Sequence, residues 1–225
     1  MTEIGESEFL YPVALSVRGR RCLVVGGGNV GTRRASSLME AGAAVTVVSP
    51  EATGQIREWA AEGMLTFLAE SFTPEHLDGA FLVIAATENP AVNAAVRDAA
   101  REKGVLLNLA APAEVDDEDE SDAGDFATMA TVRRGDLLLS VTTGGAGPAL
   151  SARLRRELEA RFGPEWGEYV ALLGKMREAA KAHIPDPKER AAALKRLAED
   201  EGLFARVMGG DYGAAWEEGM ECLLR

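Results

Sequence analysis

Three glycines near the start of the chain have the spacing of a phosphate-binding turn. Gly26, Gly28 and Gly31 form G-x-G-x-x-G, directly after the apolar run RCLVV and at the start of a helical pattern. In this motif the first glycine permits a tight turn, the second lets the main chain approach a pyrophosphate, and the third lets helix and strand pack closely. The phosphates then bind free N–H groups at the helix N-terminus, where the helix dipole favours negative charge. We therefore expect Gly26, Gly28, Asn29, Val30 and Gly31 to bind NAD; the alternative is a Rossmann domain that binds another ligand or none.

Further cofactor contacts are expected where later apolar runs end. The second run, AVTVVSP, ends at Ser49 and Pro50 rather than at an acidic residue that would hold the adenosine ribose, and no arginine follows to hold a 2′-phosphate. This favours NAD over NADP. Thr87 follows the fourth run and Asn108 lies in the fifth, at the carboxyl ends where ligands bind in such sheets. Asn89 could bind the cofactor or cap the next helix.

The elements that must position these residues alternate between strands and helices. The apolar runs RCLVV, AVTVV, MLTFLAE, AFLVIAAT and VLLNLA are separated by helical patterns, and the third helix has Pro90 in its first turn and Gly104 just past its end. Continuous apolar strands separated by helices predict a parallel sheet covered on both faces. We expect an α/β protein with a Rossmann-type sheet, then a small β dimerisation segment and a C-terminal helical domain. The predicted boundaries are 1–112, 113–147 and 148–225.

Composition narrows the class of protein. The chain has 225 residues, of which 47% are hydrophobic and 27% charged, as in a soluble globular protein. It has no run of 18 apolar residues and no apolar signal segment, so we expect a cytoplasmic protein without membrane contact. Cys22 and Cys222 are far apart and predict free thiols in a reducing compartment. His76 and His183 are also far apart, and no metal site is expected.

The charge is concentrated in one acidic stretch. The net charge is −12, and residues 114–125 (EVDDEDESDAGD) contain eight acids and no base. Such a block is typically a solvated insertion, although it could hold a cation or supply a carboxylate to a site. Without a basic stripe to offset this acidity, nucleic acid is not expected as a partner.

Three segments resemble the precorrin-2 dehydrogenase family, which includes the N-terminal module of sirohaem synthase. They are FLYPVALSVRGRRCLVVGGGNVGTRRASSLMEAGAAVTVVSP, DGAFLVIAATENPAVNAAV and VRRGDLLLSVTTGGAGPALSARLRRELE. The third is the most specific, since generic Rossmann dehydrogenases lack a strand followed by T-G-G-x-x-P and an arginine-rich helix. The resemblance covers residues 9–162 and implies a homodimer that oxidises precorrin-2 to sirohydrochlorin with NAD. Some members of the family also insert iron to give sirohaem.

The same resemblance implies a site for a tetrapyrrole substrate. Precorrin-2 carries eight carboxylates, and guanidinium groups suit carboxylates well. We expect Thr143, Gly144, Gly145 and Arg153 to bind it, with Thr143 at the position of a family serine near the tetrapyrrole. The alternative is a solvated helix face on which the arginines are balanced by acids. The residues concerned are Arg133, Arg134, Arg153, Arg155, Arg156, Glu157 and Glu159.

This chain lacks an aspartate that the family has in its active site. The family has an aspartate three residues after the asparagine of the fifth strand, and this chain has Ala111 there. Asp116, Asp117 or Asp125 could replace that carboxylate, or part of the activity could be lost. Loss of this carboxylate would impair iron insertion more than dehydrogenation, because iron insertion requires a base and a metal ligand. The alternatives are a non-catalytic tetrapyrrole- or dinucleotide-binding protein, a bifunctional dehydrogenase and ferrochelatase, and an oxidoreductase for another substrate, which would leave T-G-G-x-x-P unexplained.

Overall fold

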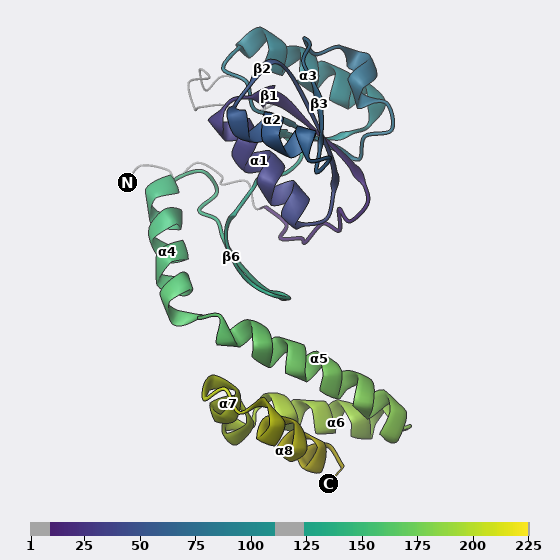
Figure 1. Cartoon of the computed structure of the whole chain (residues 1–225), viewed down its shortest axis with the longest axis vertical. Helices are drawn as coiled ribbons and strands as arrows, with labels where there is room; N and C mark the ends of the chain where they lie inside the picture. Colours follow the sequence, from purple (N-terminus) through teal and green to yellow (C-terminus); the bar gives the residue numbers. More distant parts are fainter. Residues whose placement is uncertain (1–9, 111–123, 225) are drawn as a thin grey trace, which may run out of the picture. The chain divides into compact units, whose positions relative to one another are not determined.

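The structure is a computed structural model that describes residues 10–110 and 124–224 (Figure 1). Contacts divide the chain into two compact units, one formed by Tyr11–Thr128 and the other by the chain from Met129 onward. The hairpin and the helices that follow it therefore belong to the same unit. The domain boundaries expected near residues 112 and 147 stay predictions. No helix within the described ranges is long and apolar enough to cross a membrane.

The first unit is built on a five-stranded parallel sheet. Its strand order is β3-β2-β1-β4-β5, and every neighbouring pair is parallel. Chain order reverses between β1 and β4, which makes this edge the place where ligands bind in doubly wound sheets. The predicted Rossmann-type sheet is confirmed. The strands are β1 (Arg21–Gly27), β2 (Ala44–Ala52), β3 (Thr66–Leu68), β4 (Leu82–Ala85) and β5 (Leu106–Leu109).

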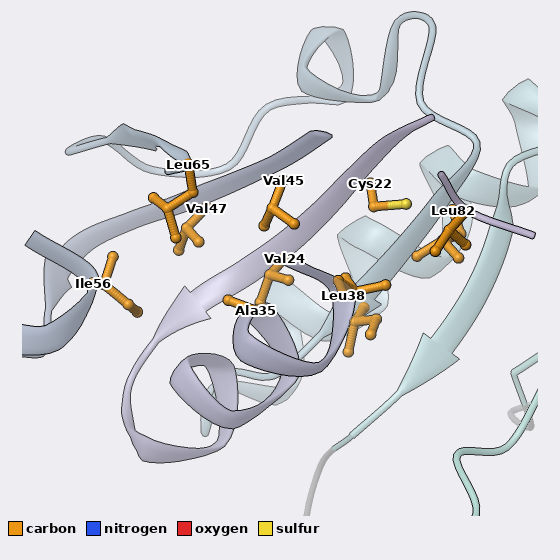
Figure 2. Close-up of a cluster of buried hydrophobic side chains, with 11 residues drawn as sticks. Cys22, Val24, Ala35, Leu38, Val45, Val47, Ile56, Leu65 and Leu82 are labelled. Carbon is orange, nitrogen blue, oxygen red and sulfur yellow. The ribbon is translucent and has the colours of Figure 1, made fainter. Parts of the chain in front are cut away.

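Helices cover both faces of this sheet, so its central strand is buried on both sides. Cys22 and Val24 of β1 pack in a core that α1 covers, as Figure 2 shows, and Ile56 of α2 belongs to the same core. Leu23 and Val25 face the opposite core, which α3 covers. Each such side chain contributes about 1.5–3 kcal/mol when fully buried, which explains why the strand reads as an unbroken apolar run. The helices are α1 (Asn29–Glu40), α2 (Gly54–Ala61), the 3-10 helix η1 (Pro74–Leu77) and α3 (Pro90–Lys103).

The second strand is longer than the sequence suggested. Val25 of β1 pairs with Val48, but Gly27 pairs with Ala52, so β2 contains extra residues at a bulge. Pro50 lies in this bulge, where the missing N–H of a proline is tolerated. The expectation that the strand ends at Ser49 and Pro50 is therefore wrong.

The second unit begins with a hairpin and continues as helices. Strands β6 (Ala130–Arg134) and β7 (Leu137–Val141) are antiparallel around a turn at Gly135-Asp136, where Gly135 has a φ of +55°. Buried side chains from α5 to α8, including Met176 and Leu197, form a separate core. The helices are α4 (Pro148–Arg161), α5 (Glu165–His183), α6 (Pro187–Ala198), α7 (Glu201–Met208) and α8 (Tyr212–Leu224).

Candidate functional site

The turn after β1 requires glycine at its first position. Gly26 has a φ of +115°, a conformation that residues with a side chain rarely adopt. A Cβ placed on Gly26 would also collide with the carbonyl oxygen of Ala86, just past β4. The chain can therefore pass this closely between β1 and β4 only because Gly26 has no side chain.

Two more glycines permit close packing, and a fourth lies open. A Cβ on Gly31 would overlap the carbonyl oxygen of Gly26, and one on Gly27 would overlap that of Glu51 in β2. A Cβ on Gly28, by contrast, would meet no atom of the described chain within 4 Å. Gly26 and Gly31 are thus required by the fold, whereas Gly28 leaves its main chain accessible to a ligand. The motif alone did not identify Gly27, because its contact comes from the neighbouring strand.

The first turn of α1 is held in place beside this opening. The hydroxyl of Thr32 donates to the carbonyl of Gly28 (2.9 Å) or shares a hydrogen bond with the hydroxyl of Thr53 (2.8 Å). The N–H of Thr53 donates in turn to the carbonyl of Gly27 (2.9 Å). Helix geometry leaves the first N–H groups of α1 without intrahelical partners. A preformed set of donors therefore faces the open side of Gly28, at the positive end of the helix dipole.

The extended end of β2 brings Glu51 to the same turn. Ser49 is half-buried, while Pro50 and Glu51 are exposed. The main chain of Glu51 lies against Gly27, since a Cβ on Gly27 would overlap the Glu51 carbonyl oxygen. Sequence reasoning missed Glu51, because Pro50 looked like the end of the strand. An acidic residue does lie at the end of β2, where Rossmann proteins hold the adenosine ribose.

A hydrogen-bonded network fixes the chain between β4 and α3. The Thr87 hydroxyl donates to Asn93 Oδ1 (2.8 Å) and accepts from the N–H of Asn89 (3.2 Å). Asn93 Nδ2 donates back to the Thr87 carbonyl (3.0 Å). Asn89 caps α3 by accepting from the N–H groups of Ala91 and Val92. Asn89 thus has the capping role, and Thr87 shapes this part of the carboxyl edge.

Asn108 is buried at that edge with one atom unpaired. The residue is only 6% exposed, and its Nδ2 donates to the carbonyl of Phe126 (2.7 Å). Its Oδ1 is buried and has no hydrogen-bond partner in the described part of the chain. Buried polar atoms are nearly always paired, so an orphan at a ligand-binding edge needs an explanation.

Asp125 has a structural contact at the edge of the sheet. Its carboxylate accepts the N–H of Leu107 in β5 (2.8 Å), and a Cβ on Gly124 would lie 2.7 Å from the Leu107 carbonyl oxygen. Residues 124–126 therefore lie alongside β5 and pair with its outer edge. This contact gives Asp125 a role in holding the sheet. Ala111, Asp116 and Asp117 lie outside the described residues.

The T-G-G-x-x-P segment forms a compact loop before α4. Gly144 and Gly145 have φ values of +61° and +87°, which explains the two consecutive glycines. The Thr143 hydroxyl accepts from the N–H of Gly147 (3.1 Å) and shares a hydrogen bond with the Ser151 hydroxyl (3.1 Å). Thr143 thereby fixes the loop to the first turn of the helix.

The arginines of α4 and β6 divide into two groups. Arg153 pairs with Glu157 (3.1 Å), and Arg155 pairs with Glu159 (3.0 Å). Both pairs are of the i,i+4 type on a solvated face, where they contribute little, and a ligand carboxylate could compete for the arginines. Arg134 instead donates from Nε to the carbonyl of Phe162 (2.9 Å), just past α4. Arg134 therefore caps that helix, and Arg153 stays a predicted substrate contact.

Metal ligands do not gather in the part of the chain that the structure describes. Residues 10–110 and 124–224 contain no group of three or more His, Cys, Asp or Glu side chains that could hold an ion. Cys22 and Cys222 are free thiols, as predicted, the first buried and the second half-buried.

Comparisons with known proteins agree with this geometry. Residues 13–126 match the family described as "Putative NAD(P)-binding", and residues 134–161 match the family described as "Sirohaem biosynthesis protein central". Siroheme synthase 1 of Aeromonas hydrophila is 36% identical over 94% of this chain and 44% of its own length. Siroheme synthase of Chromobacterium violaceum is 34% identical over 92% of this chain and 42% of its own length. The chain thus spans less than half the length of these relatives.

One solved structure is similar over nearly the whole chain. It is that of SirC, precorrin-2 dehydrogenase, with a TM-score of 0.75 and 27% identity. The likeness covers 95% of this chain and 98% of SirC, including both compact units. The resemblance to the precorrin-2 dehydrogenases that the sequence predicted is confirmed.

Proposed function

Because this chain belongs to the NAD(P)-binding family that matches half of its length, we propose that it is an NAD-dependent dehydrogenase that oxidises precorrin-2 to sirohydrochlorin. The observation that carries this proposal is the likeness to SirC over both units. A Rossmann unit alone would fit many dehydrogenases. The likeness to SirC also extends over the hairpin, the T-G-G-x-x-P loop and the helical core that follow it, and this supports precorrin-2 as the substrate.

The dinucleotide would bind along the carboxyl edge of the sheet. Its pyrophosphate fits the open main chain at Gly28 and the free N–H groups of Asn29, Val30 and Gly31. Glu51 is exposed at the end of β2, and we propose that it accepts hydrogen bonds from the adenosine ribose. A carboxylate there would repel the 2′-phosphate of NADP, which gives a firmer reason for NAD than the sequence offered. Further contacts are proposed for Gly26, Ser49, Pro50, Thr87 and Asn108.

The substrate would bind through its carboxylates. Thr143, Gly144 and Gly145 form a loop whose main chain is exposed at the start of α4. Arg153 on α4 is exposed, and its pairing with Glu157 is weak enough for a substrate carboxylate to replace it. We assign these four residues to the tetrapyrrole on this basis.

The reaction needs few chemical groups from the protein. Oxidation removes one hydride and one proton from precorrin-2, and bound NAD supplies the hydride acceptor. The protein positions the two reactants and lets the proton leave to a base or to water. The family aspartate is replaced by Ala111, and Asp125 is hydrogen-bonded to β5. We therefore assign no proton acceptor, and we propose that iron insertion is weak or absent.

A second candidate function rests on Ala111. A chain that lost the family carboxylate could bind the tetrapyrrole and the dinucleotide without catalysing their reaction. Such a protein would bind sirohydrochlorin tightly and would produce NADH no faster than a protein-free control.

We also propose a homodimer in the cytoplasm. Strands β6 and β7 form a two-stranded ribbon, an element that is marginally stable by itself. Leu138 on this ribbon and Leu150 on α4 are 40% and 44% exposed, and both are apolar. A second copy would bury this surface. Light scattering on the full chain should give twice the chain mass, and a monomer at micromolar concentration would contradict the proposal.

Turnover in the presence of each nucleotide tests the proposed function. The full chain is incubated with precorrin-2 and either NAD or NADP, while NADH or NADPH and the sirohydrochlorin spectrum are recorded. We expect sirohydrochlorin to form with NAD and much more slowly with NADP. NAD binding without sirohydrochlorin formation would support the non-catalytic alternative instead.

A further inference from the structure

Arg34 on α1 has a half-buried charge without a described counter-ion. Its Nε atom is buried and has no hydrogen-bond partner among the described residues. Burial lowers the pKa of this guanidinium, and the neighbouring charge of Arg33 lowers it further. Removing part of a charged group from water is costly unless it is paired, so an anion bound to Arg34 would offset this cost.

The helix geometry shows which way Arg34 faces. Gly31, Ala35 and Leu38 are buried against the sheet. At 100° per residue, Arg34 lies on one flank of this buried face and Thr32 on the other. Thr32 contacts Thr53 at the start of α2, on the β2 side. Arg34 therefore lies on the side of β4, the side on which Figure 2 shows Leu38 and Leu82.

The topology also shows in which direction along α1 the side chain of Arg34 points. Because β1 and β2 are parallel and α1 connects them, α1 runs back from the carboxyl edge of the sheet. Side chains in a helix lean toward its N-terminus. Arg34, in the second turn, thus leans toward the edge where the dinucleotide is proposed to bind.

Asn108 Oδ1 is a second buried atom without a described hydrogen-bond partner, and it lies on the same face of the sheet. Leu106 and Ala110 pack in the core beneath α1, and Leu107 packs in the opposite one, so Asn108 faces α1. In register, Asn108 pairs with Ile84 of β4, which pairs with Val24 of β1. A Cβ on Gly31 would lie 3.6 Å from Val24 Cγ1, so α1 passes over the sheet at this level. The unpaired Nε of Arg34 and the unpaired Oδ1 of Asn108 thus lie on the face of the sheet that α1 covers, at a similar level along the strands.

From these positions we infer that Arg34 is a specificity-determining residue that binds a carboxylate of the tetrapyrrole on the β4–β5 side of α1. The inference rests on the proposed function and concerns a residue of the Rossmann unit alone. A guanidinium offers two parallel N–H donors to a carboxylate, and precorrin-2 carries eight such groups. The Oδ1 of Asn108 would accept an N–H from the dinucleotide, for which Asn108 is a proposed contact, on the same face of the sheet.

A matched pair of variants on one helix tests this assignment. Arg34→Gln and Arg33→Gln each remove one positive charge from adjacent positions of α1, but Arg33 is exposed. Sirohydrochlorin binding is titrated without nucleotide, NAD binding is titrated separately, and KM for precorrin-2 is measured. We expect Arg34→Gln to weaken sirohydrochlorin binding and raise KM about ten- to hundredfold, the range for one charge-assisted partner. Arg33→Gln should change either value by less than about threefold, since exposed charges contribute little.

The outcomes separate this inference from the proposed function. Arg34→Lys keeps the charge but loses the planar fork, so it should bind with intermediate affinity. The inference would be overturned if Arg33→Gln and Arg34→Gln lost equal affinity for sirohydrochlorin, or if Arg34→Gln lost affinity for NAD alone. In either case the wild type would still turn over precorrin-2, and the proposed function would stand. If Arg34→Gln lowers thermal stability but Arg34→Lys binds sirohydrochlorin like the wild type, the bidentate contact is wrong. Wild-type protein that neither binds sirohydrochlorin nor forms it would instead reject the proposed function.

Discussion

Replacing Gly28 with aspartate should separate cofactor binding from folding. Gly28 is the N-cap of α1, with φ −76° and ψ −169°, values that any residue adopts. A Cβ there meets no atom within 4 Å in the described structure. Aspartate is among the favoured N-cap residues, so Gly28→Asp should leave the free energy of unfolding unchanged or raise it by a few tenths of a kcal/mol.

The same change should nearly abolish NAD binding. A carboxylate about 4 Å from one phosphate, at an effective dielectric constant of about 20, is repelled by about 4 kcal/mol. That energy corresponds to roughly a thousandfold in affinity, and rotation of the side chain toward solvent reduces it. We therefore expect at least about a hundredfold loss, with unchanged or slightly raised thermal stability.

Calorimetric titration with NAD, together with a thermal melt, measures both quantities. Gly28→Asn is the matched control, since it adds a side chain of the same size without the charge. It should bind NAD more weakly than the wild type but better than Gly28→Asp. A folded Gly28→Asp protein with wild-type affinity for NAD would refute the assignment of this turn to the pyrophosphate.

Three further predictions concern groups buried in the first unit. Gly31→Ala should lower the free energy of unfolding by more than about 2 kcal/mol, because its Cβ overlaps the Gly26 carbonyl oxygen; urea denaturation measures this, and wild-type stability would contradict the close approach. Asn93→Ala should cost about 2 kcal/mol in the same assay, since it removes two hydrogen bonds to Thr87; a loss within experimental error would show that the network is dispensable. Burial raises the pKa of the Cys22 thiol from 9.0 to about 11, so the folded state holds this proton more tightly than the unfolded state. The resulting stabilisation is complete below pH 9 and is lost as the pH rises toward 11. Denaturation at several pH values should therefore show a steeper alkaline loss for the wild type than for Cys22→Ala, and parallel curves would contradict it.

The Rossmann sheet and its glycine turn could be predicted because their signals are local. The run RCLVV is apolar at every position because β1 is covered on both faces. Gly26, Gly28 and Gly31 lie within one turn, and their spacing alone indicates their separate roles. The turn at Gly135-Asp136 is likewise marked by its own residues.

The parts that sequence reasoning missed depend on distant segments. The bulge that carries β2 through Pro50 to Ala52 depends on its pairing with β1 and not on the residues of β2 alone. Glu51 was overlooked for that reason. Asp125 is a plausible base in the sequence, but in the structure it accepts the N–H of Leu107, eighteen residues earlier. Arg34 had no motif to mark it, because its orphaned Nε is visible only once α1 lies on the sheet.

Single-turnover kinetics show whether the hydride removed from precorrin-2 is transferred to NAD. The chain in excess over precorrin-2 is mixed with NAD, and NADH and sirohydrochlorin are quantified together. We expect one NADH for each sirohydrochlorin, formed at the same rate, and almost no reaction with Gly28→Asp. Sirohydrochlorin that appears without NADH, or at the same rate in the variant, would contradict it.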